Sequence, residues 1–368
     1  MSDSVADVVV VGRGLIGSAA ARHLSAAGQT VTLVGPSEPP NYADHEGPFA
    51  SHFDQGRVTR ISAFAEPWAT WAKASIDRYA EIAEQSGITF HDPVGLVVMA
   101  DDAEAAASIG RLLNADVQML SAVELDERCG IASTVPSHRI LWEGPPAGVI
   151  NPRQLVEAQN RCALLNGATI LDDVVTSVAF ADDTVVVTCR SGVTVAARRL
   201  LACTGAYGGK LLGVDLPIER RLRTIALAEL GPGPALPTMI IENPPHPVLE
   251  SAYWVPPVLF PNGKQLLKIG GDSLPPQLGQ TDEDINQWFR QGGSAAEANA
   301  LFELLQTLLP QREIRQHGFK PCVVAYPPNG TPHITRVSSA TAVAFGGCGA
   351  SAKSSDEIGR LAAEAITE

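Results

Sequence analysis

The N-terminal stretch alternates short apolar runs with glycines in the pattern of one supersecondary unit. Val8–Val11 is a β-branched run that predicts a buried strand, and a G-x-G-x-x-G turn follows it at once. Apolar residues at helical spacing then continue to about Ala27, and Thr30–Val34 predicts a second strand. A strand, a glycine turn, a helix and a strand in this order form the context in which such a turn binds a dinucleotide.

Each glycine of this turn has a separate physical reason. Gly12 allows the tight turn, Gly14 lets the backbone approach a pyrophosphate, and Gly17 lets the helix pack closely on the strand. Leu15 and Ile16 begin the helix, where free N–H groups and the helix dipole favour an anion. We therefore predict a cofactor pyrophosphate at these five residues; the alternative is a glycine-rich turn without a ligand.

The residue that would bind the cofactor ribose is displaced. A dinucleotide fold usually carries an acidic residue at the end of its second strand. Here that position is Gly35, and the first acidic residue after it is Glu38. We predict that Glu38 reaches the ribose; the alternative is a solvated loop glutamate.

The rest of the chain reads as a mixed α/β protein. Short apolar runs broken by Pro and Gly between Arg223 and Gln316 predict strands of a mixed sheet. Near the C-terminus, a strand at Ala342–Phe345 enters a second glycine turn. The helical patterns lie at Trp68–Gln85, Pro152–Leu165, Asp282–Arg290, Ala295–Leu309 and Ser354–Ile366, and a helix is also expected after the turn that begins at Thr204.

Composition narrows the classes of function. The chain has 368 residues, enough for one large or two interwoven domains, and its net charge of −13 argues against binding to nucleic acid or to an anionic membrane surface. No apolar run is long enough to span a membrane, and the acidic N-terminus does not resemble a signal peptide. The six cysteines show neither a CxxC pair nor metal-ligand spacing, so we expect reduced thiols, a cytoplasmic protein and no metal.

A polar loop after the second strand carries candidate chemistry. Ser51 and His52 are followed by Arg57 and Arg60, an unusual concentration of cations in an acidic protein. The two arginines are three residues apart and face one site if the loop is tightly turned. We predict a cationic pair beside a flavin or a carboxylate; the alternative is surface ion pairing.

These motifs together resemble the monomeric sarcosine oxidase and N-methyltryptophan oxidase family of D-amino-acid-oxidase-like flavoproteins. The resemblance rests on the glycine turn, the Glu38-Pro39-Pro40 turn, the S-H-x-x-x-x-R-x-x-R loop and the later strand and turn motifs in the same order. It implies an α/β fold with a Rossmann-like FAD-binding domain and a mixed β-sheet substrate domain. The FAD-binding domain would comprise residues 1–87, 150–225 and 325–368, and the substrate domain residues 88–149 and 226–324.

On the flavin side, the resemblance assigns roles to three residues. Cys322, in a K-x-C-x-x-x-x-x-P frame, stands where the family attaches its flavin through a thioether; the alternative is a buried small apolar residue. Lys268 matches a lysine that assists the reaction with O₂, and Arg57 would neutralise reduced flavin. Further cofactor contacts are expected at Val175, Thr204, Gly205, Gly347, Gly349 and Lys353.

On the substrate side, the chain departs from the family. Arg60 matches a carboxylate ligand, but the second ligand, Lys353, is displaced by two residues, and Ser351 holds its ungapped position. Asp272 replaces a histidine, and we expect it to bind or deprotonate the substrate amine; the alternative is a turn aspartate. Tyr253 and Trp254 are strand neighbours that point to opposite faces, so we expect one of them, assigned to Tyr253, to face the substrate and the other to be core. Two further positions are altered: Val324 replaces a tyrosine and Phe53 replaces a histidine.

The resulting prediction is an FAD-dependent oxidase of a secondary amine or cyclic imino acid. Hydride would pass from the carbon next to nitrogen to flavin N5, giving an imine, and O₂ would become H₂O₂. The alternatives are a dehydrogenase that uses another electron acceptor and a flavin-binding protein without turnover. The expected partners are a small amine or amino-acid-like substrate and O₂, and we expect a monomer or a small homo-oligomer.

Overall fold

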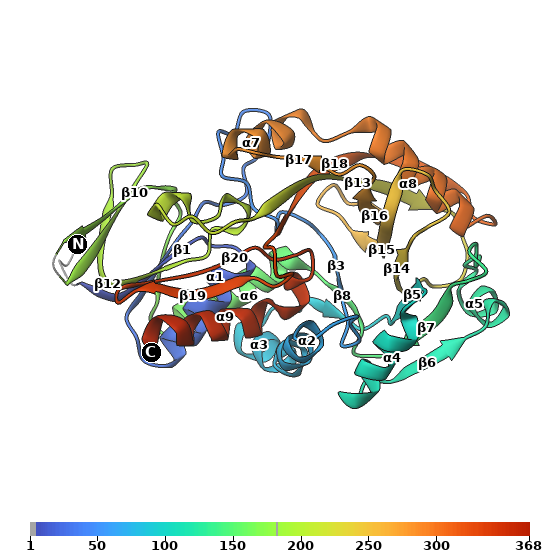
Figure 1. The fold of residues 1–368 in the computed structure, drawn as a ribbon, viewed down its shortest axis with the longest axis horizontal. Coiled ribbons are helices and arrows are strands. Elements are labelled where there is room, and N and C mark those ends of the chain that lie inside the picture. The colour runs from blue at the N-terminus through green and yellow to red at the C-terminus, as the bar shows by residue number, and fades with distance from the viewer. Residues whose placement is uncertain (1–4, 182) are drawn as a thin grey trace.

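The computed structural model describes residues 5–181 and 183–368, and it has two lobes along one long axis (Figure 1). Residues 1–4, the start of the predicted first domain, and residue 182 lie outside the described residues. The first and last described elements, strand β1 and helix α9, lie in the same lobe, because the last strand and helix return to the sheet that β1 begins. In the described residues, no helix is long and apolar enough to cross a membrane.

The first lobe is built on a mainly parallel sheet whose central strand is buried on both faces. Val8 and Val10 of strand β1 pack into the apolar core on one face, and Val9 and Val11 pack into the core on the other. The sheet has the order β10-β11-β12-β1-β2-β9, and β20 joins it beside β12 and pairs with β19. The strands are β1 Ala6–Val11, β2 Val31–Val34, β9 Thr169–Leu171, β10 Val175–Ala181, β11 Thr184–Cys189, β12 Thr194–Ala202, β19 His333–Ser338 and β20 Thr341–Phe345.

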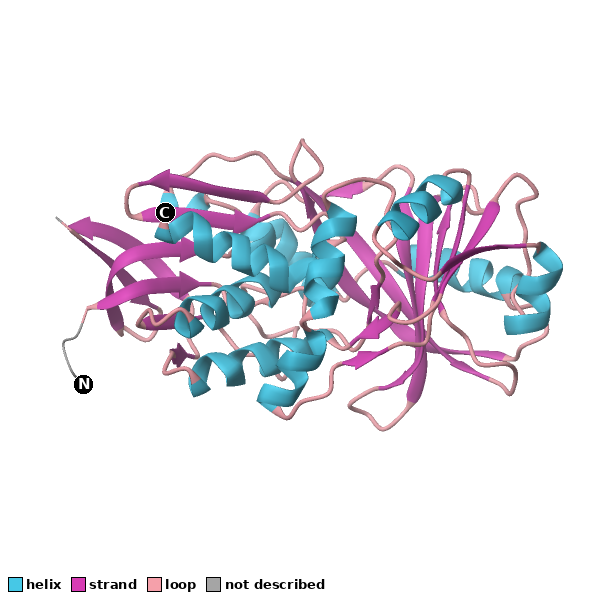
Figure 2. Ribbon diagram, turned by 90° about the horizontal axis from the view of Figure 1, so that it is seen from below, coloured by secondary structure: helices cyan, strands magenta, loops and turns pink. Residues whose placement is uncertain are grey.

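Helices cover one face of this sheet, as Figure 2 shows from below, and three of them contribute residues to the apolar core that contains Val8. They are α1 Leu15–Ala26, α6 Pro152–Leu165 and α9 Ser351–Thr367. Helices α1 and α9 approach so closely that a Cβ on Gly359 would lie 2.5 Å from the Cβ of Ala19. The C-terminal helix is therefore locked against the helix that begins at the first glycine turn.

The second lobe is a large mixed sheet of the order β17-β13-β16-β15-β14-β5-β7-β6, with β18 paired to β13. Helix α8 packs on one face, and the core between them contains the fully buried Trp254. The elements are β5 Leu96–Ala100, α4 Ala103–Leu112, β6 Val117–Leu120, α5 Ala122–Cys129, β7 Arg139–Glu143, β13 Glu219–Leu230, β14 Thr238–Glu242, β15 Leu249–Leu259, β16 Gln265–Ser273, β17 Gln277–Leu278, α7 Asp282–Gln291, α8 Ala295–Leu308 and β18 Ile314–Tyr326.

A small third sheet of order β3-β8-β4 lies where the lobes meet (Figure 1). Its strands are β3 Arg57–Thr59, β4 His91–Asp92 and β8 Gly148–Ile150. Strand β3 belongs to the polar loop that the sequence singled out. The loop is thereby fixed between the two large sheets.

Two predicted helices differ from the structure. The pattern over Trp68–Gln85 forms two helices, α2 Trp68–Asp77 and α3 Tyr79–Ser86, broken at Arg78. The Arg78 guanidinium binds two carboxylates of α9, so this residue is committed to a tertiary contact. The helix expected after Thr204 is replaced by two single 3₁₀ turns, Gly205–Tyr207 and Lys210–Leu212, because glycines with positive φ end both turns.

Candidate cofactor and substrate site

An elongated cavity of about 720 Å³ runs along the first lobe from the glycine turn to the second lobe. Its walls come from the turn after β1, the loop 46–52, the start of β10, the turn after β12, strand β18 and the turn before α9. The predicted cofactor residues that line it are Gly12, Gly14, Leu15, Ile16, Ser51, His52, Arg57, Val175, Thr204, Gly205, Cys322, Gly347 and Gly349. The fold thus brings together positions from one end of the chain to the other.

The first glycine turn has the geometry that its spacing requires. Gly12 has φ +109°, and a Cβ there would lie 2.3 Å from the carbonyl oxygen of Cys203. A Cβ on Gly17 would lie 1.8 Å from the carbonyl oxygen of Gly12, so only glycine lets α1 start this close to β1. Gly17 itself does not line the cavity. Gly14 does, and it leaves the cavity open beside His52.

His52 offers a ligand contact to this cavity. Its side chain is buried, and its Nδ1 finds no hydrogen-bond partner among the described residues. Burial lowers the pKa of His52 to about 3, so the imidazole is neutral at physiological pH. A buried polar atom without a partner is costly in a closed protein, and here a bound cofactor would satisfy it. The glycine cradle and this orphaned nitrogen together fit a dinucleotide.

Glu38, by contrast, does not line the cavity. Its carboxylate accepts two hydrogen bonds of 2.6 Å from Arg153 and one of 2.9 Å from Tyr42. Burial alone would raise the pKa of Glu38, but Arg153 outweighs it and holds the pKa below its usual range. An acidic side chain at position 35 is excluded too, because a Cβ there would lie 2.5 Å from the Arg13 backbone nitrogen. The structure therefore does not place Glu38 where the sequence predicted it.

Arg57 lies at the junction of the two lobes and touches Cys322. Its Nη2 is 4.0 Å from the Cys322 sulfur and donates to the Ser51 carbonyl at 2.8 Å, while its Nε is 3.1 Å from Asp54. Cys322 is one of six free cysteines and lines the elongated cavity.

Lys268 lies behind this pair and lines neither the elongated cavity nor the smaller second cavity described below. It is fully buried, and its Nζ donates to Asp54 at 2.5 Å and to the Gly56 carbonyl at 2.6 Å. Burial alone would raise the pKa of Asp54, but the charges of Lys268 and Arg57 outweigh it, so this pKa lies well below its usual range. Lys268 is thus linked to Arg57 through Asp54, and its Nζ also lies 5.3 Å from the centroid of the Tyr253 ring.

A second cavity, of about 220 Å³, adjoins the first. The two share Arg57, Cys322, Val324, Gly349 and Ala352 among their lining residues. Three residues predicted to contact substrate, Arg60, Tyr253 and Lys353, line this second cavity. The elongated cavity therefore ends at a small chamber, and Arg57 and Cys322 stand between them.

Two of the cations that line this chamber have few polar partners. The Nη1 atom of Arg60 is buried without a hydrogen-bond partner among the described residues. Lys353 is buried, and burial first, then the charge of Arg60, lowers its pKa to about 7. Its Nζ has only a 3.3 Å contact to the carbonyl of Ala350 and a position 5.4 Å above the Trp68 ring. Two under-satisfied cations in one small chamber form a binding site for an anion.

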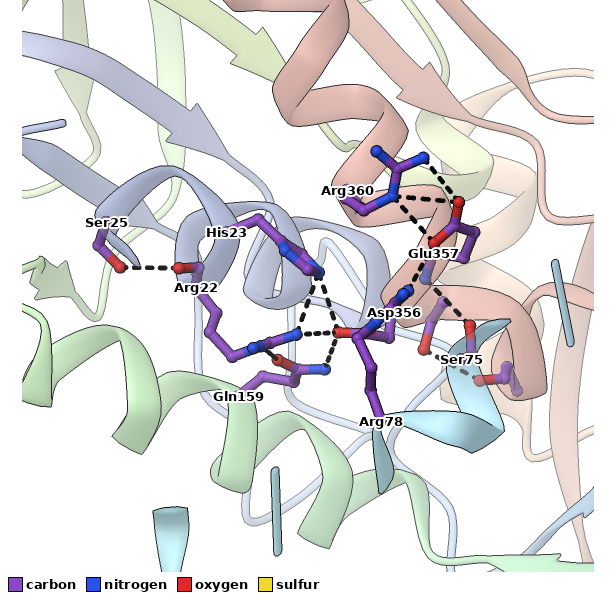
Figure 3. Close-up of polar contacts among 11 residues, drawn as sticks. Arg22, His23, Ser25, Ser75, Arg78, Gln159, Asp356, Glu357 and Arg360 are labelled. Atoms are coloured by element: carbon purple, nitrogen blue, oxygen red, sulfur yellow. Dashed lines mark hydrogen bonds and ion pairs between the residues drawn. The ribbon is translucent and has the colours of Figure 1, made fainter. Parts of the chain in front are cut away.

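Lys353 reaches the chamber because it is the third residue of α9, while Ser351 lines the elongated cavity. One turn further on, a buried network anchors this helix (Figure 3). Asp356, which is fully buried, accepts hydrogen bonds from Arg22 at 2.7 Å, Arg78 at 2.5 Å and Gln159 at 2.9 Å. The network joins α1, α6 and the α2–α3 break to α9, and so it sets the position of Lys353.

Asp272 lies on strand β16 and lines neither cavity. It forms an ion pair with Arg223, and Ser251 donates a 3.3 Å hydrogen bond to it. Arg223 and Glu242 do line the chamber, and the sequence analysis missed both. Strand periodicity could have identified Glu242, since Ile240 and Glu242 are two residues apart on β14 and share the face that lines the chamber.

Comparison with known proteins agrees with this geometry. A model of the family described as FAD dependent oxidoreductase matches residues 7–365. Over 268 residues the chain is 30% identical to monomeric sarcosine oxidase of Streptomyces avermitilis, and the match covers 70% of this chain and 66% of that enzyme. The chain thus spans just under two thirds of this relative's length.

Two solved structures share the fold over almost all of their length. NikD, an unusual amino acid oxidase essential for nikkomycin biosynthesis, is 19% identical with a TM-score of 0.80, covering 99% of this chain and 94% of NikD. L-Proline dehydrogenase from P. horikoshii is 17% identical with a TM-score of 0.77, covering 99% and 94% of the two chains. The glycine cradle, the fold and the family match lead to one conclusion: the chain belongs to the FAD-dependent oxidoreductase family.

Proposed function

We propose that the protein is an FAD-dependent oxidase of a small secondary amine or cyclic imino acid that carries a carboxylate. The observation that supports this most directly is the junction of the two cavities. A dinucleotide-sized cavity meets a small cationic chamber at Arg57 and Cys322. A substrate held in the chamber would therefore lie against the inner end of the cofactor.

FAD, when bound, supplies a two-electron acceptor, and the chain supplies its contacts. Gly12, Gly14 and the first turn of α1 would hold the pyrophosphate, and His52 would meet the cofactor through its orphaned nitrogen. The position of Cys322 beside Arg57 supports a covalent thioether to the flavin. The Arg57 guanidinium would also stabilise negative charge on the reduced ring system.

Arg60 and Lys353 would bind the substrate carboxylate, which fixes the neighbouring C–H bond near the acceptor. Two electrons and a proton would leave this carbon as a hydride, and loss of the N–H proton would complete the imine. Passing the two electrons and two protons to O₂ would give H₂O₂. The S. avermitilis relative is named for sarcosine, a secondary amine with one carboxylate, and this supports the same substrate class here.

One observation favours a dehydrogenase as the second candidate. The Lys268 amine, expected to assist the reaction with O₂, is enclosed by Asp54 and the Gly56 carbonyl and does not face either cavity. L-Proline dehydrogenase shares this fold. Transfer of electrons to an acceptor other than O₂ is therefore the alternative, and a flavin-binding protein without turnover is the third.

The test has two steps. The purified yellow protein is precipitated with acid, and a yellow pellet means that the flavin is covalent; Cys322→Ser should give a colourless pellet, whereas Cys348→Ser should not. A panel of secondary amino acids, sarcosine and L-proline included, is then mixed with the protein without oxygen, and bleaching of the flavin is followed by admission of air. Rapid recolouring with peroxide supports the oxidase. Recolouring over minutes supports the dehydrogenase, and no bleaching by any amine refutes both.

A further inference from the structure

A row of polar side chains crosses one face of the second sheet at the chamber. Strand pairing places Glu242 beside Ser251, Ser251 beside Asp272, and Arg223 beside Cys322. The Asp272–Arg223 ion pair joins the two halves of the row. The row therefore leads from the cysteine at the cavity junction to the carboxylate of Glu242.

The two carboxylates of this row differ in their partners. Asp272 is bound by Arg223 and Ser251 and does not line the chamber. Glu242 is half-buried and lines the chamber, and no hydrogen bond or ion pair to its carboxylate is found among the described residues. Glu242 is thus the carboxylate that a ligand in this chamber meets.

The surroundings of Glu242 make an anion there costly without a ligand. Burial first, and then the nearby charges of Asp272 and Glu250, raise the pKa of Glu242, although Arg60 and Arg223 act in the opposite direction. Lys353, Tyr253 and Tyr326 also line the chamber. A positive charge on a ligand would offset these unfavourable terms and favour the ionised carboxylate.

The size of the chamber limits which positively charged ligand can reach Glu242. At about 220 Å³ it is smaller than pockets for drug-sized ligands, so it suits a small molecule. Arg60 and Lys353 face the same volume and would hold a carboxylate. In a small amino acid, the one positive group within reach of that carboxylate is its own ammonium nitrogen.

Building on the proposed function, we propose that Glu242 binds the ammonium group of the substrate and so makes the chamber selective for zwitterions. It is a specificity residue, which takes the role that the sequence assigned to Asp272. A simple acid of the same shape binds Arg60 and Lys353 equally well but lacks a partner for Glu242.

The test measures binding rather than turnover, on the flavin-loaded protein at pH 8. Glycine betaine and 3,3-dimethylbutanoate have the same shape and differ only by a quaternary nitrogen in place of a carbon, and the dissociation constants are measured by calorimetry. We expect wild type to prefer betaine by about 10-fold, as for the Coulomb attraction between a unit positive charge and a partly buried carboxylate. Glu242→Gln should abolish this preference and leave the affinity for 3,3-dimethylbutanoate the same or tighter.

The control is Glu250→Gln, which removes a carboxylate that influences Glu242 but that does not line the chamber. It should keep the preference for betaine. Equal affinities for both ligands in wild type, or an unchanged preference in Glu242→Gln, overturn the inference but leave the carboxylate site intact. Failure of both ligands to bind overturns the inference and the proposed carboxylate site together.

Discussion

Lys353 provides the sharpest quantitative prediction. Its pKa of about 7 in the free protein means that the ammonium loses its proton within the accessible pH range, whereas Arg60 keeps its charge. A bound carboxylate favours the ammonium form and raises this pKa. Affinity for a carboxylate ligand must therefore fall as pH rises through 7, until the pKa of the complex is reached.

The magnitude follows from that pKa. At pH 6.5 about three quarters of the free protein carries a protonated Lys353, and at pH 8.5 about 3% does. If the complex stays protonated over this range, the dissociation constant rises about 25-fold between these values. Glu242 also titrates in the chamber, so the slope that belongs to Lys353 is the difference between wild type and a variant that lacks only this amine.

The assay is calorimetric titration with 3,3-dimethylbutanoate at half-unit steps from pH 6.5 to 8.5. Lys353→Met should bind weakly at every pH and lose the 25-fold change in dissociation constant. Lys73→Met is the matched control, because this lysine lies outside the chamber, is partly exposed and pairs with Asp77 on the surface of α2. A flat profile in wild type, or the same slope in Lys353→Met, would refute the placement of a titrating Lys353 in the chamber.

Three further outcomes are expected. The pKa of Lys353 in the folded protein lies below the ordinary 10.5, so protonation of this amine opposes folding. Lys353→Met should therefore raise the free energy of unfolding by up to about 5 kcal/mol below pH 7, and by less as pH rises toward 10.5. Urea unfolding at pH 6 and pH 9 measures the difference. Asp356→Asn should cost about 3–5 kcal/mol, because it leaves buried guanidinium groups without a counter-charge, whereas Asp77→Asn at an exposed pair should change stability by less than about 1 kcal/mol in the same unfolding assay. Gly35→Asp should lower the flavin-to-protein ratio of the purified protein, since its Cβ would collide with Arg13 at the cavity wall; full flavin content would show that the turn adapts.

The positions that could be predicted from sequence are those whose role depends on near neighbours in the chain. The turn at Gly12, Gly14 and Gly17 is one such case, because a strand, a tight turn and a helix start are all set within a few residues. The strand period of two likewise placed Tyr253 and Trp254 on opposite faces of β15, and it is Tyr253 that lines the chamber while Trp254 is core. Sequence left two candidates, Lys353 and Ser351, for the second carboxylate ligand. The structure places Lys353 at the third position of α9, where it lines the chamber together with Arg60.

The residues whose surroundings differ from the sequence-based expectation have partners far away in the chain. Glu38 is bound by Arg153, 115 residues later, and Lys268 by Asp54, 214 residues earlier. Asp272 is bound by Arg223 from another strand of the sheet. In each case a charged side chain that looked available for a ligand is neutralised inside the protein.

The sequence by itself therefore determined the nucleotide turn, the mixed α/β pattern and the family, because local spacing and chain order carry that information. Only the tertiary structure decided which charges face the chamber. An ion's availability depends on every opposite charge and every apolar group that packs against it, and strand pairing draws these from the whole chain. For this reason Arg60, Lys353 and Glu242 remain facing the chamber, whereas Lys268 and Asp272 are held within the protein.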